Sequence, residues 1–234
     1  CCVNCPGNPG AWKRHAVYHK EVKRHRKVTE DGGAAQQQNR ELAEKQALYA
    51  AQSGDAYIEL MADGARYGSK VDWRRAARTY REAIALRPDV PTAYYNLGSA
   101  LNNSGHKVEA AQRFLEAKER LPVGSEQWAA ATAWAFSMLG RKECAEVAKP
   151  EWWSDEELKA LSARVVRAAS DDTQAIEMRA LVLCGQTGAW EEGPRSAAEL
   201  KEAATHYDRT AALCPAPTQK ALFIKLADFC RGLK

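Results

Sequence analysis

The chain has 234 residues, of which 45% are hydrophobic and 27% are charged, and its formal net charge is +4. Many of the hydrophobic residues are alanines, a composition that suits closely packed helices. No apolar run approaches the roughly 20 residues of a membrane helix, and the N-terminus lacks the apolar core of a signal peptide. We therefore expect no membrane insertion.

The positive charge is concentrated between residues 13 and 27, where seven basic residues accompany one acidic residue, Glu21. This run carries a net +6, so the rest of the chain carries a net −2. A basic run can contact phosphates or anionic lipid. Its two aromatic neighbours, Trp12 and Tyr18, are too few for a base-stacking platform. We favour a solvated helix face, with nucleic-acid binding as the alternative.

Residues 1–30 also contain cysteine and histidine at spacings that suit zinc. Cys2-x2-Cys5 is followed after nine residues by His15-x3-His19, and histidines one helical turn apart can face one metal ion. Read as Cys1-x3-Cys5 and Trp12-x2-His15-x3-His19, the segment resembles the C-terminal half of a MYND zinc finger, with His19 replacing the last cysteine. The four ligands of the first MYND half are absent. The predicted zinc ligands are Cys1, Cys2, Cys5, His15 and His19, and the alternative is a tail without metal.

A repeat follows a predicted capping helix at residues 35–51. Gly64, Ala76, Tyr80, Ala83 and Pro88 recur 34 residues later, as Gly98, Ala110, Phe114, Ala117 and Pro122. A period of this length is typical of stacked helix–turn–helix units. In each unit we expect a small residue where the two helices cross, an aromatic residue that fills the gap, and a proline that ends the second helix. The first unit has predicted helices at about 55–67 and 73–86.

The second unit, PTAYYNLGSALNNSGHKVEAAQRFLEAKERLP, closely resembles a tetratricopeptide (TPR) repeat. The resemblance implies an all-α fold, a right-handed α-solenoid of TPR-like helical hairpins, which binds other proteins. The best repeats are 57–90 and 91–124, within a repeat domain that we place at residues 35–234.

The remaining units, at residues 125–215, are degenerate. Ser125 caps a helix whose expected partner, RKECAEVAKP, is short and ends at Pro150. Helices 154–169 and 172–186 form another predicted pair. Capping boxes at Ser154 and Ser196 open the predicted helices 154–169 and 196–213. Trp153 can pack on Leu158, so we expect a structural role for the paired Trp152 and Trp153. The helices that complete the prediction are 196–213 and a closing cap at 218–231.

The cysteines do not form the framework of a disulfide-rich protein. Their number, seven, is odd, and four of them stand singly in helical sequence. This usage favours a reducing compartment, cytoplasmic or nuclear. The first residue is cysteine rather than methionine, which keeps a processed organellar protein as an alternative. We expect Cys184, Cys214 and Cys230 to be small core residues, and no nucleophile with a neighbouring base emerges, which predicts a non-catalytic protein.

The TPR resemblance implies a concave groove lined by the first helix of each repeat. The groove residues that it implies are Ile58, Met61, Tyr95, Ser99, Asn102, Asn103 and Phe136. Asn96 stands at a position that grips terminal carboxylates in chaperone-binding TPR domains, but Met61, Ala65, Glu126 and Ala130 supply no cation at the other such positions. We therefore expect a neutral peptide rather than a chaperone tail.

The predicted function is that of an adaptor that binds a partner protein in this groove. The alternatives are a peripheral structural subunit of a large complex and a zinc-dependent nucleic-acid-binding protein that uses residues 1–27.

Overall fold

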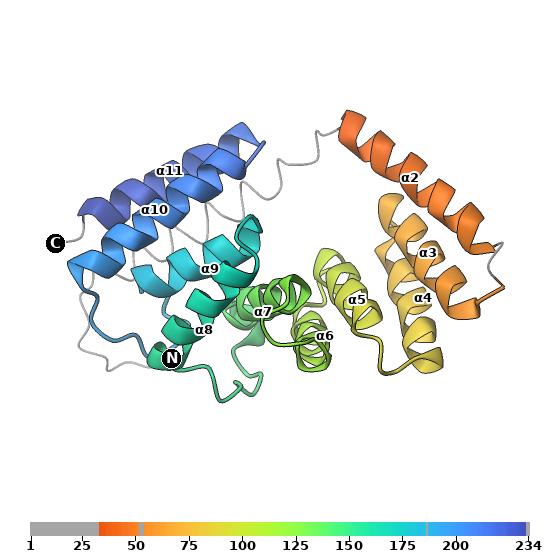
Figure 1. Cartoon of the computed structure of the whole chain (residues 1–234), viewed down its shortest axis with the longest axis horizontal. Helices are drawn as coiled ribbons and strands as arrows, with labels where there is room; N and C mark the ends of the chain where they lie inside the picture. The colour runs from red at the N-terminus through yellow and green to blue at the C-terminus, as the bar shows by residue number, and fades with distance from the viewer. Residues whose placement is uncertain (1–32, 52–53, 186, 233–234) are drawn as a thin grey trace. The chain divides into compact units, whose positions relative to one another are not determined.

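The structure is a computed structural model that describes residues 33–51, 54–185 and 187–232 (Figure 1). No β-strand occurs in these ranges, and the all-α helical-repeat fold class is confirmed. The elements are α2 (Gly33–Ala51), α3 (Ala56–Ser69), α4 (Trp73–Leu86), α5 (Pro91–Asn103), α6 (Lys107–Arg120), α7 (Glu126–Leu139), the 3-10 helix η1 (Lys142–Cys144), α8 (Asp155–Ala168), α9 (Thr173–Cys184), α10 (Ala197–Leu213) and α11 (Pro217–Gly232).

The helices belong to two compact units. The N-terminal unit comprises Gly32–Lys149 and Arg164–Ala175, and the C-terminal unit includes Pro150–Ala163 and Ile176–Lys234. The division runs through α8 and α9, so each of these helices contributes to both units. The sequence alone predicts a single repeat domain at residues 35–234.

In the N-terminal unit each helix from α2 to α7 packs on the next one along the chain, as the neighbouring ribbons of Figure 1 show. Asp55 caps the start of α3, where its Oδ1 accepts a hydrogen bond from the Tyr57 amide at 3.0 Å. Asp72 caps α4 in the same way through the Arg75 amide, at 3.1 Å. These caps satisfy amide groups that lack a partner within the helix. They set the starts of the first hairpin's two helices close to the predicted positions.

Small residues let the two helices of each hairpin approach closely. Ala76, Ala83, Ala110 and Ala117 are all fully buried, with 0% exposure. In the second hairpin, the ring of Phe114 lies against Gly98, and a Cβ built on that glycine would lie 3.1 Å from the ring. The predicted crossing of small residues with aromatic residues is therefore present in the structure.

A tyrosine and an arginine tie the second hairpin to the end of the first. The Tyr94 hydroxyl donates to the Pro88 carbonyl at 2.9 Å, and Arg120 Nε donates to the same carbonyl at 3.2 Å. The Arg120 guanidinium also lies over the Tyr94 ring, 4.3 Å from its centroid. A cation over an aromatic face is favourable beyond its packing. The turn that follows α4 is thereby held by side chains of α5 and α6.

The segment after α7 differs from the prediction. Residues 141–150 do not form an α-helix; η1 is their one helical turn. Lys149 Nζ donates to the carbonyls of Leu139 at 2.9 Å and of Cys144 at 2.8 Å. A lysine side chain thus satisfies carbonyl groups that a continuing helix would have used. The predicted short second helix of the third unit is wrong for this reason.

In the C-terminal unit, α9, α10 and α11 share one core. Its buried residues include Ala180, Ala203, Ala204, Tyr207 and Ala227, and the Tyr207 ring stacks on Phe223 with centroids 6.4 Å apart. The predicted capping box opens α10, since Ser196 Oγ accepts from the Glu199 amide while the Glu199 carboxylate accepts from the Ser196 amide. The bounds of α11 lie within one residue of the predicted closing helix.

Candidate functional site

Helix α5 buries one face and leaves the other accessible. Its buried residues include Ala93, Tyr94, Leu97 and Leu101, whereas Tyr95, Ser99 and Asn102 are half-buried and Asn103 is exposed. The half-buried residues are spaced by four and three positions, so they follow one another along one face of the helix. Four of the predicted groove residues therefore share the accessible side of α5.

Tyr95 is fixed by an aromatic cluster. Its ring meets the edge of Phe114, with centroids 5.4 Å apart at 71°, and Phe114 stacks on Trp134 of α7 at 5.7 Å and 17°. Burial and the Asp172 carboxylate raise the pKa of Tyr95, and a hydrogen bond from Trp134 opposes that rise. Offset and edge-on ring pairs contribute about 0.5–1.5 kcal/mol each beyond their buried area. Tyr95 is a neutral phenol held in one place.

The Asn102 side chain has a fixed orientation. Lys107 Nζ donates to Asn102 Oδ1 at 2.7 Å and also to the Asn102 backbone carbonyl. An ammonium group can only donate, so the amide oxygen must face it and the amide Nδ2 faces away. Lys107 thus satisfies a carbonyl at the end of α5 and leaves Asn102 Nδ2 as a donor to another molecule.

On α3, Ile58 and Met61 have different environments. Ile58 is 43% exposed, while Met61 is half-buried and packs against the cluster of Tyr57, Ala83 and Ala93. Met61 precedes Tyr95 by one 34-residue period. A flexible thioether and an apolar side chain provide contact surface without a specific hydrogen bond.

Phe136 does not lie where the groove prediction requires. It is 3% exposed, and its neighbours Ala133 and Ala135 are also buried. Helix α7 is apolar on nearly all sides, and such a helix is normally buried all round. Phe136 is therefore a core residue. Trp134, which the prediction missed, is half-buried on α7, and its ring stacks on Phe114, which in turn contacts Tyr95. Its large ring among alanines and its four-residue spacing from Ala130 are the sequence signals that could have identified it.

The predicted zinc ligands Cys1, Cys2, Cys5, His15 and His19, and the basic run 13–27, lie outside the described residues. Among the residues that the structure describes, no three His, Cys, Asp or Glu side chains are grouped so that they could hold a metal ion. Within the same ranges, no helix combines the length and the apolar character that crossing a membrane requires.

A second side-chain cluster lies in the C-terminal unit. Arg195 donates to both oxygens of Asp155, at 2.9 and 2.5 Å, and Trp190 Nε1 donates to Asp155 Oδ1 at 3.1 Å. Trp153 Nε1 donates to the Ala189 carbonyl at 3.0 Å, and the Trp153 and Trp190 rings meet edge-on at 6.0 Å. The Arg195 hydrogen bonds hold the pKa of Asp155 well below its usual range. These contacts fasten the loop between α9 and α10, which agrees with the structural role predicted for Trp153.

The search of curated proteins found no match to this chain. Residues 69–105 match the family model described as TPR repeat. The matched stretch begins at the end of α3, spans α4 and α5, and therefore includes the α5 residues Tyr95, Ser99, Asn102 and Asn103. This part of the chain is similar to a tetratricopeptide repeat, and that similarity supports a scaffold for protein–protein interaction.

Proposed function

We propose that this protein is a non-catalytic adaptor that binds an extended segment of a partner protein along the first helices of its repeats, chiefly α5. The proposal is carried by one observation, the accessible face of α5. There Tyr95, Ser99, Asn102 and Asn103 follow one another, and Lys107 fixes the Asn102 amide. The same helix lies inside the segment that matches the TPR repeat model.

The chemistry of this face suits a neutral, extended peptide. Asn102 Nδ2 donates to a backbone carbonyl of the bound chain, and the exposed amide of Asn103 can both donate and accept. The rings of Tyr95 and Trp134 supply rigid apolar contact at a low cost in side-chain entropy. Met61 and Ala65 on α3 carry no positive charge, so a terminal carboxylate has no cationic partner at these positions.

The test compares single-residue variants of the full chain in quantitative affinity capture from the native source. Asn103→Ala removes an exposed amide from α5, and Asn102→Ala removes the oriented donor. Gln112→Ala removes an exposed amide from α6 and is the matched control. Each captured protein is compared with the wild type by isotope-labelled mass spectrometry.

We expect the same partner to be depleted by both asparagine variants and retained by Gln112→Ala. Loss of one buried or oriented hydrogen bond costs about 1 kcal/mol, or roughly fivefold in binding. Equal capture by all three variants, each with unchanged helix content, would show that the α5 face is not the binding surface.

A second function, a peripheral subunit of a large complex, is favoured by one observation on α2. Leu42 is 54% exposed and Leu48 is 67% exposed, whereas Ala43 and Ala50 on the same helix are buried. Large exposed apolar side chains are common at interfaces between subunits. Light scattering of the purified chain separates the two functions: a stable monomer supports the adaptor, and insolubility that a co-expressed partner corrects supports the subunit.

A further inference from the structure

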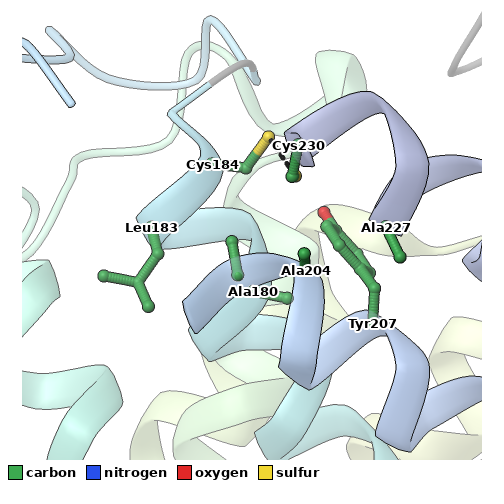
Figure 2. Packing of buried hydrophobic residues seen from close by; sticks show 8 residues of the cluster. Ala180, Leu183, Cys184, Ala204, Tyr207, Ala227 and Cys230 are labelled. Carbon is green, nitrogen blue, oxygen red and sulfur yellow. Dashed lines mark hydrogen bonds between the residues drawn. The ribbon is translucent and has the colours of Figure 1, made fainter. Parts of the chain in front are cut away.

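Two cysteines that are far apart in the sequence meet inside the C-terminal unit. Cys184 is the last residue of α9, and Cys230 lies in the last turns of α11 (Figure 2). Their sulfur atoms are 3.1 Å apart, although the two residues stand 46 positions apart in the chain. Both are buried, at 4% and 1% exposure.

The packing around the pair leaves the sulfurs facing each other directly. Ala180, Ala204 and Ala227 belong to the same buried cluster, and Figure 2 shows no side chain of the cluster between the two sulfurs. A disulfide bond is about 2.05 Å long, so the sulfurs need to approach by about 1 Å. A metal ion does not account for the pairing, because no third ligating side chain joins them in the described part of the chain.

We propose that Cys184 and Cys230 are a reversible modification site that hydrogen peroxide converts to a disulfide, fastening α11 to α9. In the first step the Cys230 thiolate attacks one peroxide oxygen; the O–O bond breaks, a sulfenic acid forms, and hydroxide leaves. In the second step the Cys184 sulfur attacks the sulfenic sulfur, the S–S bond forms, and the hydroxyl leaves as water. The two thiols are oxidised by two electrons and one peroxide is reduced to two waters.

The two sulfurs differ in a way that sets the order of these steps. The hydrogen bond that it shares with Cys184 lowers the pKa of Cys230 against the effect of burial, and the nearby Arg231 lowers it further. The same hydrogen bond, together with burial, raises the pKa of Cys184. The thiolate is the nucleophile, so Cys230 reacts first.

Helix α11 provides access to the buried pair. Its last described residues, Arg231 and Gly232, are exposed, and Arg231 is held by surface carboxylates of Asp208 and Asp228. Surface ion pairs contribute little to stability, so local opening of this last turn requires less free energy than global unfolding. A small neutral oxidant reaches Cys230 during such openings.

The experiment treats the folded full chain with hydrogen peroxide, blocks the remaining thiols, and digests it with trypsin without reductant. The sequence places Cys184 in the peptide Ala180–Arg195 and Cys230 in Leu226–Arg231, whereas Cys214 falls in a third peptide, Thr210–Lys220. Mass spectrometry then reports which peptides are joined.

We expect the Cys184 and Cys230 peptides to be joined to each other, two hydrogens lighter than their sum, and dithiothreitol to separate them. Cys214→Ala should still form the joined pair, while Cys184→Ala should leave Cys230 as an over-oxidised acid. The proposal is overturned if the peptides stay separate while other thiols oxidise, if Cys214 is joined instead, or if joining needs urea.

Hydrogen exchange supplies the structural readout. The disulfide prevents α11 from opening independently of α9, so amide exchange along α11 should slow by about tenfold or more after oxidation. Exchange along α3, in the other unit, is the internal control and should not change. Unchanged exchange in α11 of the fully joined protein would contradict the fastening.

Discussion

Gly64 lies directly against the ring of Tyr80 where α3 crosses α4, and a Cβ built on Gly64 would come within 2.5 Å of Tyr80 Cε1. The ring cannot withdraw easily because Tyr80 is 6% exposed, and burial raises its pKa to about 12. Gly64→Ala should lower the free energy of unfolding by about 1–3 kcal/mol through overpacking, despite a gain in helix propensity of about 1 kcal/mol. Urea denaturation followed by circular dichroism measures the change.

The equivalent glycine of the second hairpin is the control. At Gly98 the added Cβ would be 3.1 Å from Phe114, a less severe contact than the one at Gly64. Gly98→Ala should therefore cost less than Gly64→Ala. The double variant Gly64→Ala/Tyr80→Leu should recover part of the loss, and equal losses at both glycines would refute this account of the crossing.

Val71 occupies a left-handed backbone conformation, with φ of +64°, in the turn between α3 and α4. One period later the same position is Gly105, with φ of +90°. A β-branched residue is rarely found there, and the conformation costs an L-residue about 1–2 kcal/mol. In Val71→Gly the relief of this strain stabilises the folded state, and the greater entropy of glycine in the unfolded chain cancels part of that gain. The net result should be a free energy of unfolding that is higher by about 1 kcal/mol.

Val108→Gly tests whether this effect belongs to the turn. Val108 is 41% exposed, similar to Val71 at 50%, but it lies within helix α6. There, in the first turn of α6, the same substitution should lower the melting temperature, since glycine loses more backbone entropy on folding and removes a partly covered side chain. A melting temperature that falls for both variants would rule out strain at Val71.

Glu199 predicts a dependence of stability on pH. A hydrogen bond from Lys159, and then one from the Ser196 amide, lower the pKa of Glu199 to about 2. Because the folded pKa is below the unfolded one, the stabilisation is complete above about pH 4.5 and is lost as the pH falls towards 2. Its upper bound is about 3 kcal/mol.

Melting temperatures between neutral pH and pH 2.5 measure this contribution. Glu199→Gln should melt lower at neutral pH and approach the wild type in acid, so its profile should be flatter. Lys159→Met should flatten the profile as well, because it removes the cation that faces Glu199 at 2.8 Å. Parallel profiles for wild type and Glu199→Gln would exclude the ion pair as the source.

Gly185, with φ of +57°, makes room for Arg195, and a Cβ there would lie 2.7 Å from Arg195 Cζ. Gly185→Ala should push the guanidinium away from Asp155, so that trypsin cleaves after Arg195 faster by about tenfold or more. Gly54→Ala, at a similar φ of +66° with open space around it, is the matched control. Cleavage at the wild-type rate in Gly185→Ala would count against the ion pair as the fastening of this loop.

The first two hairpins were predictable because the same small and aromatic residues recur at the packing positions every 34 residues. Helix α4, for example, spans Trp73–Leu86, as the sequence indicated. The positions of Tyr95, Ser99 and Asn102 on one face of α5 follow from helical periodicity. The Asp155–Arg195 ion pair could not be predicted, since its partners are 40 residues apart and no period relates them. The absence of an α-helix directly after α7 could not be predicted either. It depends on the Lys149 side chain, which donates hydrogen bonds to carbonyl groups up to ten residues away in the chain.

The shared acceptor at Pro88 links the folding of two hairpins. Its carbonyl closes the first hairpin, yet both of its side-chain donors, Tyr94 and Arg120, belong to the second. If α6 unwinds, the turn after α4 loses one of its two side-chain donors at the same moment, so damage in one hairpin spreads to its neighbour. An array joined in this way resists stepwise fraying, and its inner repeats melt together.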